Sequence, residues 1–120
     1  MRNNFVLAVF LFLQSTTAFS ATSSSVGYID EVQIMGSHYK TYSVAGHAIA
    51  FIFMSELPVA CGNSCGIRRV AVGSDHPAFN VLVSTALSAK AAQQRVKLYY
   101  VNDSCSVFSS AWDFAILRVL

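Results

Sequence analysis

The chain has 120 residues, of which 54% are hydrophobic and only 12% are charged, and its formal net charge is +2. So small an excess of positive charge argues against a nucleic-acid-binding protein, which needs a basic patch and a high isoelectric point. The length is enough for one domain with a modest hydrophobic core.

Residues 1–20 have the pattern of a secretory signal peptide. Arg2 supplies a positive charge, and residues 5–13 form an unbroken apolar run. That run is too short to cross a bilayer, which takes ~20 apolar residues. We expect cleavage after Ser20, which leaves one domain over residues 21–120 that is secreted or periplasmic. An uncleaved N-terminal anchor is the alternative.

Hydrophobic periodicity predicts five strands and one helix in the mature chain, after a polar, flexible leader at residues 21–25. Period-two alternation and short apolar runs, bounded by Gly, Pro, Asn and Ser, define the strands. They are expected at residues 27–35, 48–54, 67–72, 95–100 and 111–120. The second strand is apolar on both faces and is therefore expected to be central or covered. The connection between the first two strands also holds strand-like residues, at 39–44.

The helix is expected at residues 76–92. Ser74 and Asp75 are residue types that favour the N-cap, and Pro77 suits a first helical turn. Apolar residues at helical spacing define the face turned to the core: Phe79, Leu82, Val83, Ala86 and Leu87.

The order of three strands, one helix and two strands predicts a small, mainly β protein of α+β composition. It is the order of an OB-fold, a five-stranded Greek-key barrel with a helix between strands 3 and 4. A simple α+β sandwich built from the same elements is the alternative.

The stretch 74–100 resembles the helix-plus-strand segment of the B subunit of subtilase cytotoxin and related pentameric toxin B subunits. The matching pieces are Ser74, Ala78-Phe79 and the strand residues Val96–Tyr100. Residues 27–36 match the first strand of those subunits in spacing. The resemblance implies an OB-fold, a ring-shaped homopentamer, binding of host or cell-surface glycans and, as a further partner, a separate enzymatic subunit.

The chain also resembles small exported bacterial proteins with a Cys-x3-Arg motif before the third strand and a cysteine after the fourth. The corresponding residues are Cys65, Arg69 and Cys105.

One position departs from the toxin subunits, in which a serine just before the first strand contacts a sialylated glycan. Its counterpart by spacing is Val26, and Ser25 lies one place away. A one-residue offset turns a side chain to the other face of a strand, so this site is not carried over. The candidate glycan-binding residues are Ser25, Tyr99 and Trp112. The rings of Tyr99 and Trp112 suit stacking on sugars. Core or interface packing is the alternative for both aromatic residues.

Three cysteines in an oxidising compartment leave a choice among pairings. In an OB-fold the third and fifth strands are parallel neighbours, so the start of the third lies near the turn between the fourth and fifth. This favours a Cys65–Cys105 disulfide, with Cys61 free or bonded to another chain. A Cys61–Cys65 bond is an alternative, and a zinc site of the three cysteines with His47 or His76 is another.

The sequence does not have the features of an enzyme. No nucleophile elbow, zinc-protease motif or phosphate loop surrounds the candidate bases His38, His47 and His76. We therefore expect no catalytic residue, no metal and no cofactor.

The second face of the helix predicts an interface between copies of the chain. It carries small or uncharged residues, where a solvent-facing helix normally carries charges: Val81, Ser84, Thr85 and Ser88. The predicted function is an exported subunit that binds glycans as a homopentamer. The alternative is an exported domain that binds or inhibits a protein partner and has no glycan role. Neither nucleic acid nor stable membrane insertion after cleavage is expected.

Overall fold

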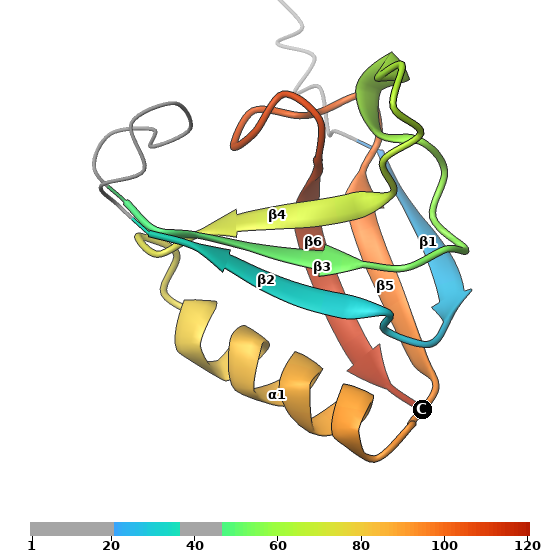
Figure 1. Ribbon diagram of the computed structural model, residues 1–120, viewed down its shortest axis with the longest axis vertical. Coiled ribbons are helices and arrows are strands. Elements are labelled where there is room, and N and C mark those ends of the chain that lie inside the picture. The colour runs from blue at the N-terminus through green and yellow to red at the C-terminus, as the bar shows by residue number, and fades with distance from the viewer. Residues whose placement is uncertain (1–20, 37–46) are drawn as a thin grey trace, which may run out of the picture.

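The computed structural model describes residues 21–36 and 47–120, which form six strands and one α-helix (Figure 1). The predicted signal peptide and the strand-like residues 39–44 lie outside the described residues. The strands are β1 (Thr22–Gly27), β2 (Glu31–Met35), β3 (Ile49–Phe53), β4 (Arg69–Gly73), β5 (Val96–Val101) and β6 (Trp112–Val119). The helix α1 is Phe79–Ala91, and a short 3-10 turn η1 covers Ala60–Gly62.

All six strands belong to one mixed sheet with the order β1-β5-β6-β4-β3-β2. Neighbours are antiparallel except β4 and β6, which are parallel. The sheet bends so that β2, β3 and β4 lie across β1, β5 and β6 (Figure 1). The small α+β composition and the parallel pair confirm the sequence-based prediction, but the described strands form an open sheet with β1 and β2 at its ends.

The first predicted strand is divided into β1 and β2, and β1 extends into residues that we expected to be a flexible leader. Each β1 residue pairs with one of β5, from Thr22 opposite Val101 to Gly27 opposite Val96. The break follows Gly27, where a Cβ would meet the carboxylate of Glu56. Backbone pairing with β5 therefore orders residues 22–25, whose polar side chains do not show the hydrophobic alternation that predicts a strand.

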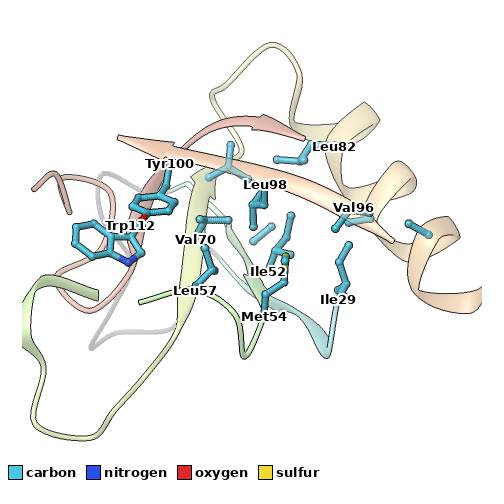
Figure 2. Packing of buried hydrophobic residues seen from close by; sticks show 14 of the residues in the cluster. Ile29, Ile52, Met54, Leu57, Val70, Leu82, Val96, Leu98, Tyr100 and Trp112 are labelled. Carbon is cyan, nitrogen blue, oxygen red and sulfur yellow. The ribbon is translucent and has the colours of Figure 1, made fainter. Parts of the chain in front are cut away.

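The main core lies between the two parts of the sheet. The alternating residues Val96, Leu98 and Tyr100 of β5 point into it (Figure 2), as their burial also shows. They meet Ile52 and Val70 from the crossing strands. Burying a side chain of this size contributes about 1.5–3 kcal/mol, so this cluster supplies the larger part of the hydrophobic stabilisation.

A second, smaller cluster occupies the opposite face of β3 and β4. Because β3 is buried on both faces, Phe51 turns away from the main core and packs with Ala71 and Ala111. Phe108 covers this cluster, and its ring packs edge-on against the Phe51 ring, with the two ring centres 5.1 Å apart. The prediction of a central or covered strand at residues 48–54 is confirmed.

The helix begins later than its sequence suggests. The N-cap is Ala78, without a side-chain hydrogen bond. The Ser74 hydroxyl instead accepts a hydrogen bond from the Ala48 N–H, which ties the start of β3 to the end of β4. The buried residues of α1 are Leu82, Ala86 and Ala89, whereas Leu87 is 48% exposed. The prediction that Leu87 faces the core is wrong, since the small side chain of Ala89 lies against the sheet in its place.

Candidate functional site

The solvent-facing side of β1, β5 and β6 forms a continuous surface, which we call the outer face. Residues opposite one another in antiparallel strands project to the same side. Tyr99 pairs with Ser24 on one side and with Ile116 on the other. Lys97 pairs with Val26 and with Arg118. The outer face is defined by these six residues: Ser24, Val26, Lys97, Tyr99, Ile116 and Arg118.

Tyr99 lies at the centre of the outer face and is held by two cations. The Arg118 Nη1 atom donates a hydrogen bond to the Tyr99 hydroxyl at 3.4 Å. The Lys97 Nζ atom lies 5.2 Å from the centre of the Tyr99 ring, within cation–π range. The hydrogen bond from Arg118, and then that from Lys97, lowers the pKa of Tyr99. This arrangement offers an aromatic ring, a nearby serine and two positive charges to one ligand.

The three predicted glycan-binding residues do not come together. Ser25 pairs with the fully buried Leu98, so it belongs to the inner side of β1 and faces away from Tyr99. Trp112 is only 8% exposed, and its Nε1–H donates a hydrogen bond to the Pro58 carbonyl at 3.0 Å. Its ring centre lies 5.1 Å from that of Tyr100. The prediction for Trp112 as a sugar-stacking residue is therefore wrong, and the core alternative holds.

Sequence patterns alone did not identify Ser24 and Arg118 as neighbours of Tyr99. Strand alternation would have placed Ser24, rather than Ser25, on the same face as Tyr99 if residues 22–27 had been recognised as a strand. Arg118 required the register between β5 and β6, which a bulge between Tyr99 and Tyr100 interrupts.

The disulfide joins Cys61 to Cys105, with Cα atoms 6.4 Å apart, and Cys65 is an exposed free cysteine. The predicted Cys65–Cys105 pairing is therefore wrong, although the loop before β4 does lie beside the turn after β5. The Asn63 side chain closes a local turn by accepting from the Ile67 N–H and donating to the Ile67 and Ala60 carbonyls. This turn presents Cys65 to solvent and leaves Cys61 beside Cys105.

Asp113 organises the loop on the other side of the disulfide. Its Oδ1 atom accepts hydrogen bonds from the Ser106 and Val107 N–H groups, and its Oδ2 atom accepts from the Ser104 and Ser106 hydroxyls. Partial burial acts to raise the pKa of Asp113, but these hydrogen bonds outweigh it and lower that pKa below its ordinary value of 3.8. The carboxylate thus fixes the segment that carries Cys105.

The predicted interface residues lie on α1 outside the core. Val81 is 69% exposed, Ser84 and Ser88 are also exposed, and Thr85 is half-buried. The exposed Leu87 enlarges the apolar part of this surface. Apart from the exposed Lys90 in its last turn, the solvent-facing side of α1 is uncharged, and Val81 and Leu87 are its large apolar side chains.

The remaining candidate groups do not form a metal centre within residues 21–36 and 47–120. No cluster of three or more His, Cys, Asp or Glu side chains there is placed to hold a metal ion. The three-cysteine zinc alternative fails because two of the sulfurs form the disulfide. His76 accepts a hydrogen bond from the Ala78 N–H, and His47 is exposed, whereas His38 lies outside the described residues.

No protein-family model, curated protein or solved structure matches this chain. The resemblance to toxin B subunits therefore stays a prediction. Within the described part of the chain, α1 falls short of the length and apolar character that crossing a membrane requires.

Proposed function

We propose that the protein is an exported carbohydrate-binding subunit that captures glycans on the outer face. The observation that carries this proposal is Tyr99, an outward ring with Ser24 beside it in register and with Lys97 and Arg118 bound to it. An aromatic ring packs on the apolar face of a sugar, while hydroxyl and guanidinium groups bind its oxygens.

The charge of the outer face favours an acidic glycan. Among residues 21–36 and 47–120, the charged groups that act on Tyr99 are the cations Arg118 and Lys97. A guanidinium binds a carboxylate or sulfate through two parallel hydrogen bonds, which is stronger than a bond between neutral groups. A sugar that carries a carboxylate or sulfate should therefore bind the outer face more tightly than its neutral analogue.

The fold included in this proposal is an OB-fold whose first strand is broken. The order β2-β3-β4-β6-β5-β1, with α1 between β4 and β5, is the order of that barrel when β1 and β2 are treated as one strand. The two segments are consecutive in the chain and occupy opposite ends of the sheet. This supports a barrel that is open at the break.

The same proposal includes assembly into a ring of identical subunits, a homopentamer as in the toxin B subunits that the sequence resembles. Support comes from the exposed surface of α1, where Val81 and Leu87 are the large apolar side chains and Lys90 is the single charged residue. A ring would bring several outer faces to one cell surface, and multivalent attachment compensates for weak individual sites. A separate enzymatic subunit is a further partner that the resemblance implies.

A protein-binding role is the second candidate, because the outer face also has apolar positions. Val26 is 43% exposed and Ile116 is 49% exposed, on either side of the Lys97–Tyr99 segment. Such residues suit the apolar centre of a protein interface, which is rich in aromatic side chains and arginine.

A glycan array probed with residues 21–120 separates the two candidates. We expect binding to acidic glycans, reduced by Tyr99→Ala and by Arg118→Ala. Lys90→Ala is the matched control for lost positive charge, since Lys90 is an exposed cation on α1 and not one of the outer-face residues. An array without a glycan signal, together with saturable binding of a protein partner through Val26 and Ile116, would favour the second candidate.

A further inference from the structure

A cleft of about 430 Å³ lies between the β1–β2 connection and the C-terminal end of α1. It shares no residue with the outer face. Tyr28, Ile29 and Asp30 line one side of the cleft. The other side is lined by residues at the end of α1 and in the segment between α1 and β5: Ala89, Lys90, Gln93 and Gln94. The volume lies within the range of small-molecule sites in proteins.

The cleft has an apolar base and a polar rim. Ile29 is 6% exposed and Ala89 is 1% exposed, so both belong to the core, and their apolar side chains are the most buried part of the cleft lining. Tyr28 is 51% exposed and adds an accessible aromatic ring. The rim carries a carboxylate, an ammonium group and two carboxamides, from Asp30, Lys90, Gln93 and Gln94.

The polar groups at the rim retain capacity for a ligand. The Asp30 Oδ2 atom accepts a hydrogen bond from the Ser55 N–H, which orients the carboxylate. Within residues 21–36 and 47–120, the Oδ1 atom and the side-chain amides of Gln93 and Gln94 form no hydrogen bond with the protein. The opposite charges of Asp30 and Lys90 leave the rim without a net charge.

Gln93 occupies a backbone position that normally favours glycine. Its φ is +53°, and it ends α1 in a motif in which the Gln94 N–H donates to the Ala89 carbonyl and the Gln93 N–H donates to the Lys90 carbonyl. A non-glycine residue pays a conformational cost in this left-handed region. Gln93 thus places its side-chain carboxamide at the cleft in spite of this conformational cost, as strained residues at functional sites do.

We propose that this cleft binds a neutral pyranose sugar. A pyranose has an apolar face for Ile29, Ala89 and the Tyr28 ring, and hydroxyls that both donate and accept. Those hydroxyls match a rim with an acceptor-only carboxylate, a donor-only ammonium group and carboxamides that do both. A strongly charged ligand would meet a like charge at either Asp30 or Lys90. The site thus differs in ligand class from the cationic outer face.

The test is an NMR titration of residues 21–120 with a panel of neutral hexoses and N-acetylhexosamines. We expect saturable shifts of backbone amide signals at residues 28–30 and 89–94 for at least one sugar. Gln93→Gly is the informative variant, because glycine relieves the left-handed backbone and removes the carboxamide. It should leave the fold at least as stable and weaken sugar binding by about tenfold, the effect of one lost hydrogen bond of average to high strength.

Two controls separate this proposal from the outer-face site. Gln33→Ala removes an exposed carboxamide from β2, outside the cleft, and should leave the affinity unchanged. Tyr99→Ala should also leave it unchanged. Absence of saturable shifts at the cleft for every sugar, shifts confined to the outer face, or wild-type affinity in Gln93→Gly would each overturn the proposal.

Discussion

Removing the Cys61–Cys105 disulfide should cost about 4 kcal/mol of unfolding free energy. The bond joins residues separated by 44 positions. In the chain-entropy model, closing a loop of that length lowers the entropy of the unfolded chain by about 13 cal/mol/K, or about 4 kcal/mol at 25 °C. Cys61 is exposed and Cys105 half-buried, so little apolar surface is lost when both become alanine. The chain-entropy effect should therefore dominate in the double variant.

Urea denaturation of the double variant and of the wild type measures this cost. With a slope of about 1–3 kcal/mol per molar urea, the midpoint should fall by roughly 1–4 M. Cys65→Ala is the matched control, because it removes the exposed free thiol. A surface substitution of this kind should change stability by no more than ~0.5 kcal/mol.

The single variants decide the pairing. Cys61→Ala should lose the same stability as the double variant, since the turn closed by Asn63 holds Cys65 towards solvent. If Cys65→Ala were strongly destabilising and Cys61→Ala were neutral, the functional bond would be Cys65–Cys105 and our reasoning would be refuted.

Three further substitutions test the loop, the core and the assembly. Asp113→Asn should be less stable at neutral pH. The lowered pKa of Asp113 stabilises the wild type above pH 3.8, and this stabilisation is lost as the pH falls through the pKa of Asp113 in the folded protein. The stabilities of the two proteins should therefore converge in acid. A difference in denaturation midpoint that does not depend on pH would contradict this. Trp112→Phe should cost about 2–4 kcal/mol in denaturant, because it leaves a cavity and deprives the Pro58 carbonyl of its donor, and a loss below ~0.5 kcal/mol would argue against that role. Ser88→Arg should shift light-scattering mass from an oligomer to a single chain, whereas a wild-type mass of one chain would rule out the ring.

Period-two alternation was a reliable guide where side chains decide the structure. Val96, Leu98 and Tyr100 alternate with outward residues as predicted, because one face of β5 meets the core. The same rule failed for residues 22–25, which are polar and ordered by backbone hydrogen bonds to β5. An edge strand with polar side chains, held mainly by backbone hydrogen bonds, lacks the alternating hydrophobic pattern by which a strand is predicted.

The candidate site was predicted less completely because it depends on pairings between distant residues. Tyr99 was identified from its residue type, but Arg118 reaches it only through the β5–β6 register. The cysteine pairing likewise depends on the local turn closed by Asn63, which determines whether Cys61 or Cys65 lies beside Cys105. Residue type thus indicated the chemistry of the outer face, while long-range geometry determined which groups share it.

The pairing of β1 with β5 also sets when this chain can fold. Thr22 lies opposite Val101, a separation of 101 − 22 = 79 residues, and the Asn102 N–H donates to the Ala21 carbonyl at the very start of β1. Sheets built from such distant contacts fold slowly, because the entropy of closing a long loop is lost before the contacts form. Strand β1, which directly follows the predicted signal peptide, therefore has no partner strand until β5 has been synthesised. The sheet is therefore completed only after β5 has been synthesised and β1 has paired with it.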